Sequence, residues 1–322
     1  MARKLRPYAQ IYATAAKKIG LRAVRINDQT VDILHKKNRI RFFYAMCSKN
    51  DSVSAAISRY KFATNAVLKA ANLPVFEQQV FNRESKKEIN AFIKKIKLPV
   101  VVKPADSFQG DGITVNITSL AAVHEAVDIA HRYSRRIIIE KYYKGEDYRI
   151  LIAHGKILAA TLRLPARVVG DGVHTIEELI TSANKKLPKK IKIDPEVKNR
   201  LLEQDMTMHT IPVPKEVVYL RYRANAALGG TTVNLDVRHV HPDNLKACVR
   251  AVETLGLELA GVDLMTSDIT QSYKKTKGAI TEINDNPAID IHSSATLNPI
   301  PDITERVLAA LFEIPYRPLV RK

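Results

Sequence analysis

Cysteine is scarce in this chain and tryptophan is absent. The two cysteines, Cys47 and Cys248, lie far apart and form no CxxC pair. This usage excludes a disulfide-rich scaffold and argues against a zinc site, so we expect a protein of the reducing cytoplasm. No run of eighteen apolar residues occurs, and we therefore expect neither a transmembrane helix nor a membrane partner.

Several motifs of known enzyme classes are also missing. The sequence contains no GxxxxGK[ST] P-loop, no GxGxxG after a strand, no GxSxG nucleophile elbow and no HExxH. Aromatic residues make up only 6% of the chain and are not interleaved with basic residues as in RNA-binding modules. Nucleic acid is therefore not the expected partner.

Acidic residues are outnumbered, with 33 of them against 51 lysines and arginines and a net charge of +18. Residues 1–27 contain no acid, which suits a basic first helix better than a transit peptide. Residues 184–200 contain seven basic residues against Asp194 and Glu196. An acidic peptide or polymer substrate would explain this lysine-rich segment, and so would a solvated basic loop.

Helical and strand patterns alternate along the chain without internal repeats. The mixture of helices and short hairpins predicts an α+β fold with antiparallel sheets rather than a doubly wound parallel sheet. Expected helices cover 8–20, 54–71, 85–96, 120–133, 176–183, 195–204, 242–257 and 301–312. Expected strands cover 31–34, 40–44, 100–103, 113–117, 136–142, 149–153, 156–161, 217–221, 259–265 and 278–284.

One strand of this pattern ends on a lysine and a glycine-containing turn. Val100–Lys103 is an apolar strand, and residues 106–112, with Gly110 and Gly112, lead into the next strand. Glycine allows backbone N–H groups to approach an anion closely, and the lysine adds a positive charge beside them. The pattern predicts a phosphate site, although an ordinary hairpin would look similar.

Two strands near the C-terminus carry carboxylates among apolar residues. Asp263 lies in an otherwise apolar strand, and alternation places Glu282 and Asn284 on one face of the next strand. If the two strands are neighbours, Asp263 can join that face. Carboxylate and amide oxygens are ligands that Mg²⁺ takes alongside phosphates, which predicts a magnesium site; an exposed polar face is the alternative.

Two further segments carry weaker signals. The strand ending at Glu140 runs into a hinge that could offer backbone groups to a purine, with Asp147 available for ribose hydroxyls. Arg221, Arg223 and Asn225 precede a glycine pair and could meet a phosphate, or they could merely be solvated.

The order of these segments resembles the ATP-grasp family of carboxylate–amine ligases. It runs Arg59-Tyr60-Lys61, the strand ending at Lys103 with its glycine loop, the segment Glu140 to Arg149, Gly261-Val262-Asp263, and Glu282 to Pro287. Within that family, residues 165–176 are similar to a segment of cyanophycin synthetases, and bifunctional glutathione synthetases share part of the pattern. The resemblance covers about residues 55–315.

The resemblance implies an ATP site with a role for each matching residue. Lys61 and Lys103 would contact the phosphates, and residues 106–112 would form a loop over them. The adenosine residues it implies are Glu140, Lys141 and Tyr143 for adenine and Asp147 for ribose, and the loop residues are Ser107, Gly110 and Gly112. Asp263, Glu282 and Asn284 would hold two Mg²⁺ ions, with Mn²⁺ as an alternative. Arg221 or Arg223, with Asn225, would lie near the γ-phosphate or an acyl-phosphate.

The resemblance also implies the domain organisation. We expect an ATP-grasp fold of two α+β subdomains with antiparallel sheets that grip ATP, preceded by a short N-terminal α/β segment. The expected divisions are 1–54 for that segment, 55–315 for the ATP-grasp domain, about 98–143 for one subdomain, about 184–215 for a lysine-rich insertion and 316–322 for a tail. The usual Pro-Gly after the metal strand is Pro287-Ala288 here, and Asp290 replaces a basic residue, so cyanophycin polymerisation is not expected.

The implied activity is ligation of an amino-acid or peptide carboxylate to an amine, through an acyl-phosphate and with release of ADP and phosphate. Small amino-acid or peptide substrates, acidic ones included, are the expected partners, and a homo-oligomer is compatible with the resemblance. The competing interpretation is a non-catalytic ATP-grasp module that binds an anionic polymer through its basic surface.

Overall fold

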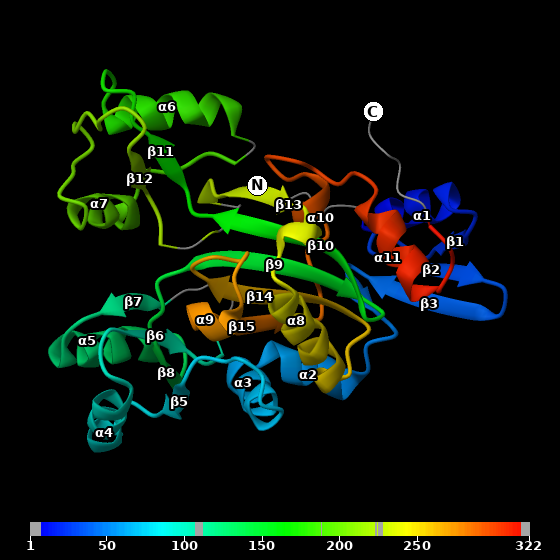
Figure 1. Cartoon of the computed structure of the whole chain (residues 1–322), viewed down its shortest axis with the longest axis horizontal. Coiled ribbons are helices and arrows are strands. Elements are labelled where there is room, and N and C mark those ends of the chain that lie inside the picture. The colour runs from blue at the N-terminus through cyan, green and yellow to red at the C-terminus, as the bar shows by residue number, and fades with distance from the viewer. Residues whose placement is uncertain (1–7, 107–111, 188, 223, 225–227, 317–322) are drawn as a thin grey trace.

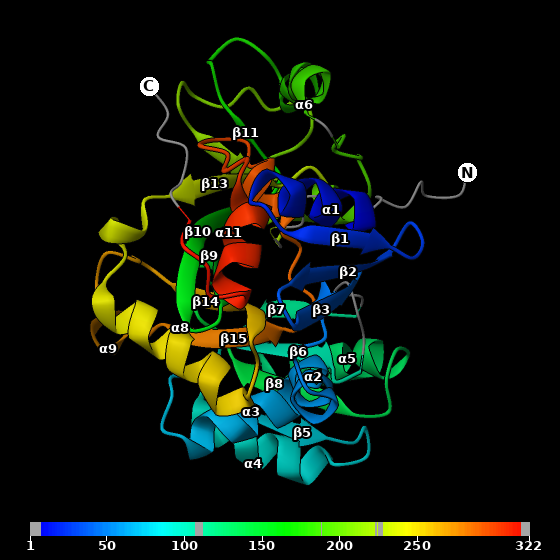
Figure 2. The same ribbon diagram turned by 90° about the vertical axis from the view of Figure 1, so that its right-hand side faces the viewer.

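The computed structural model describes residues 8–106, 112–187, 189–222, 224 and 228–316. Within them, a large antiparallel sheet lies at the centre, and smaller lobes of helices and sheets lie around it (Figures 1 and 2). Every ladder between two named strands of these residues is antiparallel, which confirms the expected α+β class. No helix of the described segments is long and apolar enough to cross a bilayer.

The N-terminal segment forms a sheet with the strand order β1-β2-β3-β4. Its elements are α1 (Tyr8–Lys18), β1 (Arg22–Arg25), β2 (Thr30–His35), β3 (Asn38–Phe43) and β4 (Met46–Cys47). The ring of Tyr12 on α1 stacks on the ring of Phe42 on β3, with the ring centroids 4.0 Å apart. Helix α11 (Ile303–Leu311) packs against the same core. The first and last helices therefore share one core at one end of the central sheet.

The helix expected over residues 54–71 is two helices. α2 (Ser52–Arg59) and α3 (Lys61–Ala70) are separated by Tyr60, whose backbone is extended at φ −104° and ψ 103°. Asp51 caps α2 by accepting from the N–H groups of Val53 and Ser54. The prediction of one continuous helix was wrong, and the break makes Lys61 the first residue of α3.

A second sheet, with the order β5-β8-β6-β7, forms what we call the α4/α5 lobe. Its elements are β5 (Gln78–Phe81), α4 (Lys86–Ile96), β6 (Val100–Pro104), β7 (Thr114–Ile117), α5 (Leu120–His131) and β8 (Ile137–Lys141). Val100, Val102, Ile137 and Ile139 pack against α4 and α5. Since side chains alternate along a strand, Lys103 and Glu140 project from the opposite face of the sheet.

The central sheet has the order β13-β10-β9-β14-β15. Its strands are β13 (Thr231–Leu235), β10 (Lys156–Leu164), β9 (Glu146–Ala153), β14 (Leu259–Thr266) and β15 (Ala279–Asn284). One face packs against α3 and α8 (Pro242–Leu255) through side chains such as Ile150 and Val262. The other face is apolar towards α1 and α11 and charged towards the opposite end, where the candidate site lies. Short elements η2 (Val237–His239), α9 (Tyr273–Thr276) and α10 (Asp290–Ser293) complete this region.

A third unit, which we call the lysine-rich lobe, is built from β11 (Arg167–Val169), α6 (Ile176–Lys186), α7 (Pro195–Leu202) and β12 (Val217–Tyr219). Its small core contains Val168, Ile180, Leu201 and Val218. Thr175 and Glu178 form a reciprocal capping box at the start of α6. Figure 1 shows this lobe above the central sheet and the α4/α5 lobe below it.

Candidate active site

Two charged residues from neighbouring strands pair on the inner face of the α4/α5 lobe. Lys103 of β6 donates from Nζ to Glu140 Oε2 of β8 at 2.9 Å, and their side chains are 9% and 11% exposed. The register pairs Val101 with Glu140 and Lys103 with Ile138, so the two polar residues lie diagonally across adjacent strands. Because both side chains are largely buried, the ammonium of Lys103 and the carboxylate of Glu140 compensate each other's charge.

Lys61 brings a second lysine to the same place from the start of α3. Burial lowers the pKa of Lys61, while the carboxylates of Glu282, Glu140 and Asp263 oppose that shift and Lys103 adds to it. These interactions connect side chains from α3, the α4/α5 lobe and the central sheet. The two lysines expected at phosphates therefore share one electrostatic environment with Asp263 and Glu282, the expected metal-binding carboxylates.

The carboxylates of the last two strands face each other. Asp263 of β14 and Glu282 of β15 are directly paired in register, and Gly261 pairs with Asn284. Directly opposite residues of an antiparallel pair lie on the same face, so the condition set by the sequence is met. Asp263 is buried, whereas Glu282 and Asn284 are half-buried. Two carboxylates and an amide thus converge on the charged end of the sheet.

Two arginines that sequence analysis did not single out hold Asp263. Arg149 of β9 bonds both Asp263 oxygens, and Arg163 of β10 lies 2.7 Å from Oδ2. Burial opposes the charge on Asp263, but the guanidinium groups outweigh it and keep the pKa of that carboxyl below its usual value. Strand alternation could have placed Arg149 beside Asp147 on one face of β9, but it could not show that β14 lies next to β9.

Asp147, expected at the ribose, is part of the same network. Its carboxylate oxygens lie 2.6 and 2.7 Å from Arg163 Nη2. Burial raises the pKa of Asp147 in spite of that arginine. The residues expected to contact ribose and metal are therefore linked through one guanidinium.

The hinge residues expected at the adenine are anchored by their polar atoms. Tyr143 donates from its hydroxyl to the Thr276 carbonyl at 2.6 Å and accepts from the Ser267 N–H. Lys141 Nζ donates to the carbonyls of Lys97 and Leu98 at 2.8 and 3.2 Å. The Tyr143 ring also stacks on Phe76, with the ring centroids 5.2 Å apart, so both side chains brace the hinge.

Arg221 lies in the lysine-rich lobe. It is 3% exposed and bonds Glu196, Asp194 and the Lys192 carbonyl, the last two at 2.7 and 3.0 Å. Ser107, Gly110, Arg223 and Asn225 lie outside the described residues. Gly112 is described and has φ +71°, and an added Cβ would lie 2.6 Å from the Tyr133 ring, so the end of the loop requires glycine.

Comparisons with known proteins agree on the family. Residues 63–211 match the family model described as the D-ala D-ala ligase C-terminus. A cyanophycin synthetase from Trichormus variabilis is 30% identical over 319 residues, which cover 96% of this chain and 35% of that protein. A bifunctional glutathione biosynthesis protein from Streptococcus agalactiae is 32% identical over 281 residues, covering 83% of this chain and 37% of that protein.

Solved structures give the same answer. A bifunctional glutathione synthetase from Pasteurella multocida superposes with a TM-score of 0.71 at 25% identity, over 96% of this chain and 44% of the other. A D-alanine–D-alanine ligase from Bacillus anthracis shares the fold at 14% identity, with a TM-score of 0.51 over 82% of this chain and 69% of the other. This chain is an ATP-grasp protein. It spans about a third of the length of the curated relatives above.

The donor set of this ATP-grasp protein suits a hard cation in part. Among the described residues, no group of three or more His, Cys, Asp or Glu could hold a metal ion alone. Asp263, Glu282 and Asn284 supply two carboxylates and one amide oxygen, which is the incomplete set that Mg²⁺ accepts when phosphates fill the remaining positions. The residues fit such an ion, which would share Asp263 with Arg149 and compete for it with Arg163.

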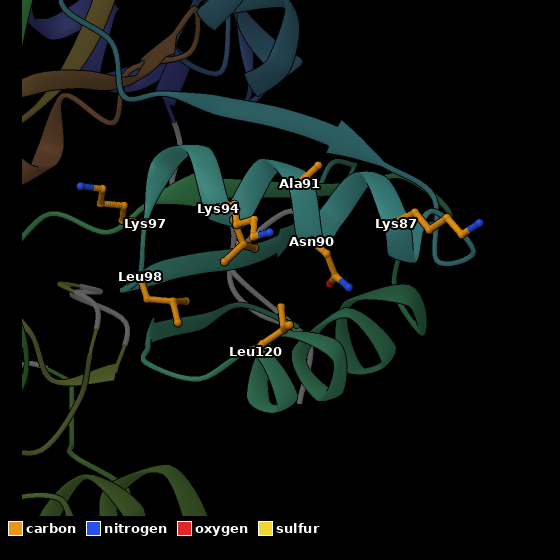
Figure 3. A pocket seen from close by; sticks show the side chains of 8 residues that line it. Lys87, Asn90, Ala91, Lys94, Lys97, Leu98 and Leu120 are labelled. Atoms are coloured by element: carbon orange, nitrogen blue, oxygen red, sulfur yellow. The ribbon is translucent and has the colours of Figure 1, made fainter.

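A surface cavity of about 640 Å³ lies away from this site, between α4 and the start of α5 (Figure 3). Lys87, Lys94 and Lys97 surround it, with Ile93 and Leu120 among its apolar lining. Because α4 and α5 cover the face of the sheet opposite Lys103 and Glu140, the cavity is not part of the ATP-grasp site.

Proposed function

We propose that this ATP-grasp protein is a ligase that joins an amino-acid or peptide carboxylate to an amine at the expense of ATP. The observation that carries the proposal is the convergence of Lys61, Lys103 and Glu140 with the cross-strand pair Asp263–Glu282. The named relatives are ligases, which favours catalysis over a non-catalytic binding module.

In the proposed reaction, the substrate carboxylate attacks the γ-phosphorus of ATP. The bond to the β-phosphate oxygen breaks, which yields an acyl-phosphate and ADP, and the amine then displaces phosphate to form the amide. Such phosphoryl transfer needs charge neutralisation and alignment more than covalent help from the protein. Lys61 and Lys103 supply fixed positive charge for the phosphates.

Other residues of the site have proposed roles at the adenosine, the metal ion and the acyl-phosphate. Glu140, Lys141 and Tyr143 flank the proposed adenine position, and Asp147 is the proposed acceptor for ribose hydroxyls. Asp263, Glu282 and Asn284 would hold Mg²⁺, which when bound neutralises phosphate charge. Arg223 and Asn225 keep their proposed place near the acyl-phosphate, and Arg221 could join them only by leaving Asp194 and Glu196.

Turnover in the presence of substrate pools tests the proposal. The full chain is incubated with ATP, Mg²⁺ and mixtures of amino acids and dipeptides, and ADP, phosphate and amide products are measured. We expect ADP release that depends on one pool and is lost in Glu282→Gln. Absence of ADP release with every pool, together with absence of ATP binding, would overturn the proposal.

Acidic substrates are the class that the charge distribution favours. Asp194 and Glu196, the acids of the lysine-rich segment, turn inward to Arg221. The exposed lysines of that segment are therefore not neutralised by its own acids; they are Lys185, Lys186, Lys189, Lys190, Lys192 and Lys198.

The two cysteines are free and buried, which supports the proposed reducing cytoplasm.

Charge reversal tests the acidic class. Lys189→Glu with Lys190→Glu should raise the KM for acidic substrates and leave that for neutral ones unchanged. The matched control is Lys36→Glu with Lys37→Glu, two exposed lysines in the turn between β2 and β3. Equal KM changes for acidic and neutral substrates would contradict a docking role.

A further inference from the structure

The guanidinium of Arg163 lies between two carboxylates with different proposed ligands: Asp147, the proposed ribose acceptor, and Asp263, the proposed metal ligand. Arg163 Nη2 lies 2.6 and 2.7 Å from the oxygens of Asp147 and 2.7 Å from Asp263 Oδ2. The side chains of Arg163, Asp147 and Asp263 are 18%, 26% and 5% exposed. This bridge is shielded from solvent, so its charges act on one another strongly.

Strand order explains how one side chain reaches both acids. Arg163 of β10 is paired in register with Asp147 of β9, its direct neighbour. Asp263 lies one strand further, on β14, paired with Arg149 of β9. Arg163 therefore extends across β9 to the strand that carries the proposed metal ligand.

The contacts of Asp263 create a competition. A divalent cation at Asp263 would meet the positive charges of both Arg149 and Arg163. Arg163 has a second carboxylate to which it can transfer entirely, since both Asp147 oxygens are within hydrogen-bond distance of it. Its Nε is buried without a hydrogen-bond partner among the described residues, so the guanidinium is not fixed on every side.

We propose that Arg163 is a positioning residue that contacts Asp263 and moves towards Asp147 when a metal ion binds. It thereby couples the metal position to the ribose position. This inference rests on the proposed function, because it takes Asp263 as a metal ligand and Asp147 as the ribose acceptor.

Metal affinity without nucleotide tests the coupling, with Mn²⁺ as the probe and paramagnetic resonance of free Mn²⁺ as the readout. Arg163→Met removes a competing cation and should tighten Mn²⁺ binding by at least about threefold. Arg163→Lys keeps the charge and should stay near the wild-type affinity. The matched control is Arg41→Met, which removes an arginine that bonds the buried Asp32 in the N-terminal sheet at 2.6 and 2.8 Å and should not change Mn²⁺ affinity.

A second variant keeps the inference open to refutation if Arg163→Met does not fold. Asp147→Asn removes the alternative partner of Arg163 and should weaken Mn²⁺ binding. Where both variants fold, the loss of Mn²⁺ affinity caused by Asp147→Asn should be smaller in the Arg163→Met background than in the wild type. If Asp147 acted on the metal only through its own negative charge, that loss would be as large or larger in the Arg163→Met background.

The outcomes separate this inference from the proposed function. Folded Arg163→Met with wild-type or weaker Mn²⁺ affinity would overturn the role of Arg163 while leaving the metal site intact. Unchanged affinity in Asp147→Asn would overturn it as well. No Mn²⁺ binding by the wild-type protein, with or without ATP, would overturn both the inference and the proposed metal ligands.

Discussion

Lys103 and Glu140 form an ion pair of 2.9 Å between β6 and β8, and neither side chain is more than 11% exposed. A buried pair of this kind is costly to break, because removal of one partner leaves an uncompensated charge. In the proposed complex with ATP, phosphate oxygens would share Lys103 with Glu140. The pair therefore holds the lysine in place before the nucleotide arrives.

Replacing Lys103 should separate stability from nucleotide binding. Lys103→Met should lower the free energy of unfolding by about 3–5 kcal/mol, since the Glu140 carboxylate stays buried without its partner. Lys103→Met with Glu140→Leu should recover much of that loss in urea unfolding, because an apolar pair needs no compensation. ATP binding, measured by calorimetry, should be absent in both. Wild-type ATP affinity in the double variant would contradict a phosphate role for Lys103.

Glu282→Gln should affect the metal and not the fold. No hydrogen bond ties Glu282 to another described side chain, and the residue is half-buried. Only its electrostatic interaction with Lys61 is lost, so the free energy of unfolding should change by less than about 1 kcal/mol. ADP release should fall at least about tenfold, because an amide is a weaker Mg²⁺ ligand than a carboxylate. Glu253→Gln, an exposed residue of α8, is the control and should retain full ADP release. Equal ADP release in the two variants would argue against Glu282 as a ligand.

Gly261 provides the space through which Arg149 reaches Asp263. A Cβ at Gly261 would lie 2.8 Å from Arg149 Cδ and 3.0 Å from its Nη1. Gly261→Ala should therefore displace Arg149 and lower the free energy of unfolding by about 1–3 kcal/mol, measured in urea. In an Arg149→Ala background the same substitution should cost less, because the crowded atoms are gone. An undiminished cost in that background would place the clash elsewhere, for example at Pro287, 3.2 Å away.

Local patterns in the sequence predicted which side chains share a strand face at the candidate site. Alternation placed Glu282 and Asn284 on one face, and the observed β14–β15 register adds Asp263 to it. The two arginines that hold Asp263 could not be predicted in the same way. Their contact depends on β9 lying between β10 and β14, and Arg149 and Asp263 are 114 residues apart in the chain.

The errors in the fold arise where the local sequence pattern is weak or misleading. Apolar residues keep a helical period through Tyr60, and neither glycine nor proline marks the break between α2 and α3. Strand β5 and strand β13 were missed because Gln78–Phe81 and Thr231–Leu235 are short and largely polar. Tertiary pairing with β8 and β10 determines their conformation instead.

Folding stability should depend on pH through His292. Burial lowers the pKa of His292 to about 3, and the charges of Arg149 and Arg163 add to the shift. The pKa of a histidine in an unfolded chain is about 6.5, so only the unfolded state takes up this proton as the pH falls from there towards 3. The contribution is complete above pH 6.5 and is lost progressively below it.

The expected size of this effect allows a direct test. Between pH 7 and pH 5 the free energy of unfolding should fall by about 2 kcal/mol on account of His292 alone. Asn can take the place of the imidazole Nδ1, which lies 2.6 Å from the Thr161 hydroxyl, and it does not titrate. His292→Asn should therefore lose stability at both pH values but show a smaller difference between them in urea unfolding. A pH dependence identical to that of the wild type would mean that His292 is protonated in the folded protein at pH 5, in spite of the two arginines beside it.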